Sequence, residues 1–193
     1  FDPSSTATYS IPATQIRKLF ISKLDPYGGF LWAIGIEGGT RQEGHRIVTD
    51  ASGNIYVAGL FIGTVDFDAG PGVFNLTSNT SSDVFVAKYD PNGSFLWAIG
   101  VGGFASESVE GMVLNDVGEI TLTGDFAEQV DFDPGAGMFN LTSAGSFDMY
   151  VLTLDNSGNF VWAKRIGGNA ADAGTGIDVD SANALYLTGS FTG

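Results

Sequence analysis

Two short acidic motifs in the chain have residue types that bind a divalent cation. Each reads Asp-x-Asp-x-Gly, with carboxylates from Asp66 and Asp68 in one motif and from Asp131 and Asp133 in the other. Ca²⁺ takes about six to eight oxygen ligands, and a loop of this kind can direct two carboxylates and a carbonyl oxygen to one point. The sequence therefore predicts a weak calcium site in each loop, with Asp2 as the remnant of a third motif.

The same carboxylates have an ordinary structural role open to them. Asp side chains in turns accept hydrogen bonds from backbone N–H groups of their own loop. Neither motif continues into the further Asp or Asn positions and the final Glu of an EF-hand loop. Calcium ligands and turn caps therefore both stay open as interpretations of the four residues.

Catalytic chemistry has less support. His45 is the only histidine, and as a general base it would act beside Glu43 and Arg46. When the repeats described below are aligned, Gly111 and Thr175 take its position. The chain has no cysteine, and one histidine cannot build a multi-histidine zinc site. We expect His45 to lie at the start of a strand without a catalytic role.

Glu107 and Glu110 could imitate the carboxylate pair of a glycosidase. Acidic residues are common in loops, however, and spacing along the chain does not fix the distance between two carboxylates in the fold. The sequence therefore predicts a protein without enzymatic activity.

The elements that must position these residues occur three times. Trp32, Trp97 and Trp162 follow one another at intervals of 65 residues, in the phrases FLWAIGIEGG, FLWAIGVGG and FVWAKRIGG. A fixed period of this length indicates stacked supersecondary units. The tryptophans recur at one phase of an apolar strand, which predicts packing between units rather than an aromatic platform for sugars.

We treat residues 1–193 as a single segment. The repeats cover approximately 1–64, 65–129 and 130–193.

Short strands account for all the regular structure that the sequence predicts. Runs of Val, Ile, Phe, Tyr and Thr are bounded by Gly, Asn, Asp or Pro, and no stretch has the apolar period of an amphipathic helix. The turns DASGN, DPNGS and DNSGN suit a type I turn followed by a left-handed glycine. We expect 83–90 to pair with 95–100, and 46–50 to pair with 54–59.

The predicted fold class is all-β, a partial ring of β-propeller blades. Two hairpins give four antiparallel strands per repeat, and such units arranged around an axis form propellers of about four to eight blades. The segments VDFD and FNLTS form an extra small hairpin at the outer edge of the sheet or on one rim. This hairpin explains why the repeat is longer than an ordinary blade.

The phrases GNIYVAGLF, GTVDFDAGPG, FNLTS and DVFVAKYDPNGSFLWAIGVGG resemble the bacterial β-propeller repeats often labelled SBBP. Those repeats occur in large secreted or surface proteins of bacteria, notably the Bacteroidetes. The resemblance covers essentially the whole chain and implies a propeller in an extracellular setting, without a general assigned activity. The first copy departs from the pattern at residues 4–18, which replace the FNLTS-like stretch.

Three blades fall short of the roughly four that close a ring. The chain begins inside one rim segment and ends where the other copies continue with VDFD, so we expect a piece of a longer repeat array. Further blades of the same protein or a second copy should cover the faces of the end blades. Two copies forming a six-bladed ring is the simplest arrangement.

The charge balance limits the class of partner. The chain has 8 basic and 22 acidic residues, a net charge of −14. Such a surface repels nucleic acid and anionic lipid and attracts cations. No apolar run approaches the length of about 18 residues that inserts into a membrane.

The sequence thus predicts an extracellular or cell-surface scaffold that presents loops and blade edges to a surface protein or a glycan. The alternative is a calcium-assisted carbohydrate-binding module or a polysaccharide-acting enzyme on the same fold. A binding or hydrolytic site should break the repeat symmetry at clustered polar residues, whereas a scaffold should keep its landmarks equivalent.

Overall fold

The computed structural model describes residues 9–11 and 18–192. These residues form strands and no helix, as the sequence predicts. The strands are β1 (Phe20–Leu24), β2 (Phe30–Gly35), β3 (Glu37–Gly38), β4 (Arg41–Thr49), β5 (Ile55–Ile62), β6 (Thr64–Asp66), β7 (Asn75–Thr77), β8 (Asp83–Tyr89), β9 (Phe95–Gly103), β10 (Gly111–Leu114), β11 (Ile120–Phe126), β12 (Gln129–Asp131), β13 (Asn140–Thr142), β14 (Asp148–Leu154), β15 (Phe160–Ile166), β16 (Asp172–Val179) and β17 (Leu185–Phe191). No helix able to cross a membrane occurs in the described ranges.

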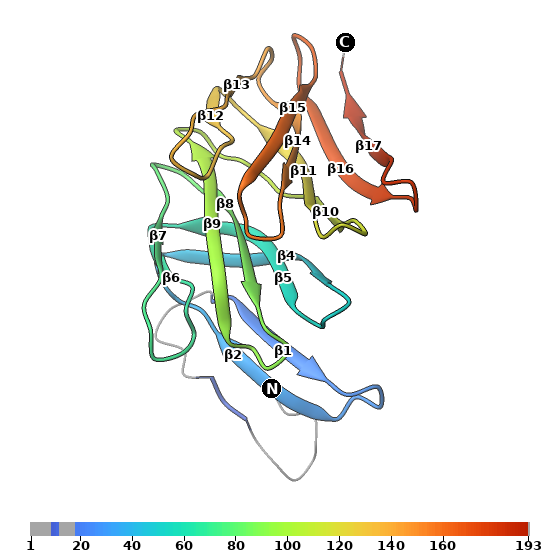
Figure 1. The fold of residues 1–193 in the computed structure, drawn as a ribbon. Helices are drawn as coiled ribbons and strands as arrows, with labels where there is room; N and C mark the ends of the chain where they lie inside the picture. The colour runs from blue at the N-terminus through green and yellow to red at the C-terminus, as the bar shows by residue number, and fades with distance from the viewer. Residues whose placement is uncertain (1–8, 12–17, 193) are drawn as a thin grey trace.

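The antiparallel sheets follow one another along an arc (Figure 1). Two of them contain complete four-stranded blades, β4-β5-β8-β9 and β10-β11-β14-β15, named from the inner strand outward. The hairpin β1–β2 lies at one end of the arc and the hairpin β16–β17 at the other. The expectation of propeller-like blades in a partial ring is confirmed, with a two-stranded half-blade at each end.

The expected hairpins form. β8 pairs with β9 across the DPNGS turn, and β4 pairs with β5 across the DASGN turn. The Asp of each turn caps it: Asp90 accepts the N–H groups of Asn92 and Ser94, both at 2.8 Å. The small hairpins β6–β7 and β12–β13 form as well, and β12 pairs with the end of β9 at the outer edge of the first complete blade.

The blades and the sequence repeats are out of phase. We expected the two long hairpins of one repeat to share a sheet, but β8–β9 and β10–β11 belong to different blades. Each complete blade combines the inner hairpin of one repeat with the outer hairpin of the next. Turn residues specify the pairing within a hairpin, whereas contacts between distant strands decide which hairpins share a sheet.

The first copy keeps a rim contact although its sequence departs from the repeat pattern. Tyr9 packs on Phe30 with ring centroids 5.0 Å apart, as Phe74 packs on Phe95 at 4.9 Å. Residues 9–11 therefore occupy the place of the FNL phrase. Most of the remaining divergent segment lies outside the described residues.

The central strands of the complete blades are covered on both faces. Every residue of β8 and of β14 is buried, and so are seven of the eight residues of β5. One apolar cluster lies between the two complete blades, and a second lies between the first complete blade and the β1–β2 hairpin. Burial on both faces explains why these strands are apolar along their whole length.

A tryptophan of the outer strand binds the turn of the following blade. The indole N–H of Trp32 in β2 donates to the carbonyl of Pro91 at 3.3 Å, and that of Trp97 in β9 donates to the carbonyl of Asn156 at 3.2 Å. We call this interaction the tryptophan contact. It confirms for these two residues that the repeated tryptophan packs between blades.

A lysine and a glycine complete the tryptophan contact. Lys23 and Lys88 donate to the same two carbonyls, at 3.0 Å and 3.2 Å. Gly158 lies against the Trp97 ring with a φ of +83°, and a Cβ there would come within 3.1 Å of the ring. Only glycine combines this left-handed backbone with the close approach of an indole.

Replacing this glycine should therefore destabilise the fold. Gly158→Ala adds a clash with Trp97 to the cost of a left-handed alanine and should lower the free energy of unfolding by about 2–3 kcal/mol. Gly118→Ala is the matched control, because its φ is +85° and its Cβ would meet only ordinary contacts, the nearest at 3.4 Å. It should lose about 1 kcal/mol. Urea unfolding measures both, and equal losses would contradict the role of the indole.

Candidate functional site on the inner strands

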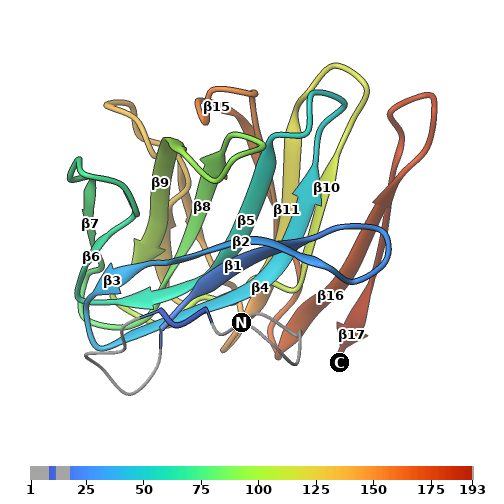
Figure 2. The same cartoon turned by 90° about the horizontal axis from the view of Figure 1, so that it is seen from below.

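The exposed residues of the inner strands β4, β10 and β16 differ from blade to blade. β10 contacts both of the other strands (Figure 2). A bulge in the register makes His45 the extra residue in β4 and Thr175 the extra residue in β16. Glu110 takes this position in the middle copy. The residue after it, Gly111, pairs with Thr123 of β11, just as Arg46 pairs with the equivalent residue Ala58 of β5. Bulges re-aim side chains and are common beside functional sites.

The structure corrects one detail of the repeat alignment. The sequence alignment of the repeats places Gly111 at the position of His45, which requires Asp116 to be the capping residue of the turn in the middle copy. In the fold Asn115 caps this turn, because its side-chain oxygen accepts two backbone N–H groups. An amide oxygen serves as well as a carboxylate here. Glu110 is therefore the counterpart of His45.

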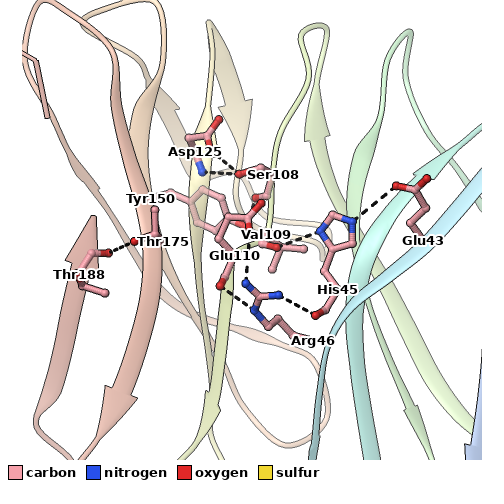
Figure 3. A network of polar contacts seen from close by, with 10 residues as sticks. All are labelled: Glu43, His45, Arg46, Ser108, Val109, Glu110, Asp125, Tyr150, Thr175 and Thr188. Atoms are coloured by element: carbon pink, nitrogen blue, oxygen red, sulfur yellow. Dashed lines mark hydrogen bonds and ion pairs between the residues drawn. The ribbon is translucent and has the colours of Figure 1, made fainter. Parts of the chain in front are cut away.

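Arg46 joins the first two inner strands (Figure 3). Its Nε donates to the backbone carbonyl of Glu110 at 2.7 Å, and its terminal nitrogen lies 3.2 Å from Glu110 Oε2. A second terminal nitrogen donates to the carbonyl of His45 at 2.8 Å. Both side chains of the ion pair remain partly exposed. This bridge could not be predicted from the sequence, because Glu110 is brought beside Arg46 only when the bulges of the inner strands are aligned correctly.

His45 uses both ring nitrogens in the same region. Nδ1 lies 3.3 Å from the carbonyl of Val109, and Nε2 lies 3.7 Å from Glu43 Oε2. A carbonyl only accepts, so the first contact requires a proton on Nδ1. Glu43 also accepts from Arg41 at 2.6 Å. The imidazole is thus held between two blades rather than aimed at a nucleophile.

A serine near this network is bonded to a carboxylate. The Ser108 hydroxyl donates to Asp125 Oδ1 at 2.5 Å, and Tyr150 donates to the Ser108 carbonyl at 2.8 Å. Burial and the nearby Asp125 raise the pKa of Tyr150 well above its ordinary value. The serine hydroxyl has a carboxylate partner and no imidazole partner, so the arrangement differs from a catalytic triad.

Two buried carboxyl groups lie where β8 begins and β9 ends, since Asp83 is the first residue of β8 and Glu107 accepts the N–H of Gly103 at the end of β9. Burial raises the pKa of Asp83 to about 6, and burial together with Asp83 raises the pKa of Glu107 to about 8. In the described structure Asp83 Oδ1 and Glu107 Oε2 have no hydrogen-bond partner. Near neutral pH the pair therefore holds about one proton. Glu107 is buried whereas Glu110 is bound to Arg46, so the two glutamates do not form a glycosidase-like pair.

The residues at the positions of Asp83 and Glu107 differ between the three copies. In the third copy Asp148 accepts a bond from Arg165 at 2.9 Å. In the first copy Lys18 and Gln42 replace the two acids, and Lys18 pairs with Glu37 at 2.7 Å. The middle copy alone, among these three, places two carboxyl groups there without a basic partner.

The Asp-x-Asp loops hold themselves with their own carboxylates. Asp66 Oδ1 accepts the N–H groups of Asp68 and Phe74 at 3.1 and 2.7 Å, and Asp131 Oδ1 makes the equivalent bonds at 3.1 and 2.7 Å. Asp68 and Asp133 each accept a glycine N–H at 2.8 Å. These bonds are those of turn caps. Asp2 lies outside the described residues.

The two loops line equivalent hollows of about 410 and 400 Å³ beside the outer strands. Glu37 lines the first hollow and Asp83 the second. Across residues 9–11 and 18–192 no three acidic or histidine side chains gather closely enough to hold a metal ion. Calcium binding by the loops stays a prediction.

Comparison with known proteins supports the blade architecture. No family model matches the chain. Over 191 residues it is 24% identical to the uncharacterized WD repeat-containing protein L264 of Acanthamoeba polyphaga mimivirus, covering 84% of the chain and 13% of that protein. It is 26% identical over 155 residues to the regulatory protein FlaEY of Caulobacter vibrioides, covering 78% of the chain and 16% of that protein.

WD repeats form four-stranded propeller blades. The fold is propeller-like. The order of strands in the sheets and the similarity to a WD repeat protein both support a propeller-like fold. The chain spans less than a fifth of the length of either relative. The finer resemblance to SBBP-type repeats stays a prediction.

The buried acid pair predicts a specific pH dependence. In the unfolded chain Glu107 ionises near its ordinary pKa of 4.5, whereas in the fold it stays protonated up to about 8. The contribution of the raised pKa of Glu107 to the free energy of unfolding is therefore full below pH 4.5 and is lost as the pH rises through about 8. Glu107→Gln should therefore be more stable than the native protein at about pH 9, by on the order of 1 kcal/mol, and similar at about pH 4.

Urea unfolding at the two pH values measures this difference. Glu128→Gln removes an equal charge at an exposed position and is the control. A native protein with the same pH profile as Glu107→Gln would contradict the buried acid pair.

Proposed function

We propose that the chain is a non-enzymatic interaction segment of a β-propeller that binds a protein partner through its inner strands. The observation that carries this proposal is the contrast between constant packing residues and variable exposed ones. The tryptophan contact recurs between blades, whereas the bulge position holds His45, Glu110 and Thr175 in turn. Similarity to a WD repeat protein supports an interaction scaffold.

The contacts of the polar residues support binding rather than catalysis. His45 and Arg46 make bonds that hold neighbouring blades together, and the Ser108 hydroxyl is bonded to a carboxylate. A general base needs a free nitrogen or carboxylate within reach of a substrate proton. The network instead offers a rigid, partly exposed set of charges, which suits recognition of a surface.

The charge of the chain indicates the chemistry of the partner. A net charge of −14 favours a partner with a basic surface and steers its approach over a range set by salt. Glu110 lies on this surface, where its Oε2 pairs with Arg46 at 3.2 Å and its side chain remains partly exposed. We therefore propose a basic protein segment as the class of partner.

We also propose an extracellular or cell-surface location. The acidic surface and the resemblance to secreted bacterial repeats support it. Fractionation of the native cells with an antibody against the chain tests the location, and a signal confined to the cytoplasm would contradict it. Calcium-assisted glycan binding has no comparable support, since the carboxylates of the two loops already accept bonds within their own turns.

Selection from a displayed peptide library tests the interaction site. We expect basic peptides to be enriched on the immobilised chain. Glu110→Lys should weaken their binding about tenfold, or about 1.4 kcal/mol. Glu128→Lys makes the same charge change in an exposed turn away from the inner strands and should leave the affinity within about twofold. Equal losses in the two variants, or no enriched basic peptide, would contradict the proposal.

A further inference from the structure

In the third copy an arginine neutralises the buried carboxylate at the start of the outer hairpin. Arg165 in β15 donates to Asp148 Oδ2 at 2.9 Å, and the same oxygen accepts the N–H of Ala144 at 2.7 Å. Asp148 is fully buried, whereas the Arg165 side chain is 34% exposed. The guanidinium group thus reaches a buried carboxylate from a partly exposed position.

The middle copy keeps the carboxylate but lacks the arginine. The register of β9 on β8 puts Gly100 at the position that Arg165 has in β15. Asp83 takes the position of Asp148 and is 4% exposed. Its Oδ2 accepts from the backbone and side-chain nitrogens of Asn79 at 3.1 and 3.4 Å, and its Oδ1 has no hydrogen-bond partner in the described structure. Asp83 is therefore a buried carboxyl group without the basic partner that its counterpart has.

A hollow of about 400 Å³ lies at the place of the missing arginine side chain, and we call it the β9 hollow. Asp83 and Gly100 line it. Asp131 and Asp133 line it as well, from the loop between β12 and β13 that lies beside the end of β9 (Figure 1). All of its lining residues are described and lie between positions 61 and 134, in the middle of the chain.

The walls of the β9 hollow near Gly100 are apolar and leave room for a side chain. A Cβ added at Gly100 would meet the Phe61 ring at 3.4 Å and Leu76 at 3.9 Å, which are ordinary contacts. The methylene groups of a long basic side chain can lie along such a surface while its charged end reaches a carboxylate. The hollow thus combines an apolar wall with acidic residues.

The spread of the carboxylates favours a guanidinium group over a metal ion. In the described ranges no three acidic side chains come close enough together to hold one ion. A guanidinium group carries several N–H donors in a fixed plane and binds carboxylates through two donors at once. It can therefore contact groups that lie too far apart to ligate a common cation.

We propose that the β9 hollow binds the guanidinium group of an arginine side chain from a partner protein. The guanidinium takes beside Asp83 the place that Arg165 has beside Asp148. Asp131 and Asp133 add negative charge around it. The burial of Asp83 strengthens the attraction, because charges interact more strongly away from water. The site lies at the outer edge of the first complete blade, so it is independent of the partner proposed for the inner strands.

The first copy offers a natural contrast. Its equivalent hollow lies at Gly35, where an added Cβ would come within 2.5 Å of Ile11. Lys18 replaces the carboxylate of Asp83 and pairs with Glu37. Among these three copies, the middle one alone therefore combines a buried carboxyl group with open space for a basic side chain.

NMR titration with a capped Gly-Arg-Gly peptide tests the site. The peptide should bind with a dissociation constant on the order of 1 mM and shift the amide signals of the residues that line the hollow. The same peptide with citrulline, which has nearly the shape of arginine and no charge, should bind at least about tenfold more weakly. Equal affinity for the two peptides, or no binding up to about 10 mM, would overturn the proposal.

Two pairs of variants locate the bound peptide. Asp83→Asn should raise the dissociation constant at least about tenfold, whereas Asp178→Asn makes the same change at an exposed position of β16 and should leave it within about twofold. Gly100→Arg supplies a guanidinium from the chain itself and should abolish binding, whereas Gly100→Ala adds only a Cβ and should stay within about threefold. Unchanged binding to Asp83→Asn and Gly100→Arg, or a loss in Glu110→Lys of the inner strands instead, would assign the peptide to another surface and overturn the proposal.

Discussion

The tryptophan contact is the interaction on which the rest of the structure depends. An indole N–H and a lysine from one blade converge on a single carbonyl in the turn of the next blade, as Trp97 and Lys88 do at Asn156. That turn must keep one shape, which its capping Asp and its left-handed glycine provide. The contact therefore explains why the tryptophan and the lysine of one copy occur with the Asp-x-x-Gly turn of the next in the two contacts that form, whereas Thr153 takes the lysine position in the third copy. It also fixes the position of each blade against its neighbour.

Once the blades are positioned, the inner strands are free to vary. Their bulge residues belong to neither apolar cluster, so His45, Glu110 and Thr175 can share one structural position without loss of packing. Variation at a rigid, solvent-facing position is how repeat scaffolds acquire a binding surface. The buried acid pair shows that some variation also reaches the interior, where Asp83 and Glu107 carry an electrostatic cost.

Local signals in the sequence were sufficient to predict the all-β fold, the hairpins and the packing role of the tryptophan. The DPNGS turn determines that β8 pairs with β9, because its capping bonds lie within five residues. Nothing local determines that β5 pairs with β8 of the next repeat, so the phase of the blades could not be predicted. The bridge between Arg46 and Glu110 was missed for the same reason.

The Asp-x-Asp motifs illustrate the limit of pattern alone. Their residue types suit both a calcium ligand and a turn cap, and the folded structure shows that Asp66 and Asp131 accept backbone N–H groups. The indole protons offer the most direct test of the central claim. Hydrogen exchange of the three indole N–H groups, followed by NMR, should be slow for Trp32 and Trp97 and faster for Trp162, whose indole has no carbonyl partner within the described residues. Fast exchange at all three would contradict a structure held together by the tryptophan contact.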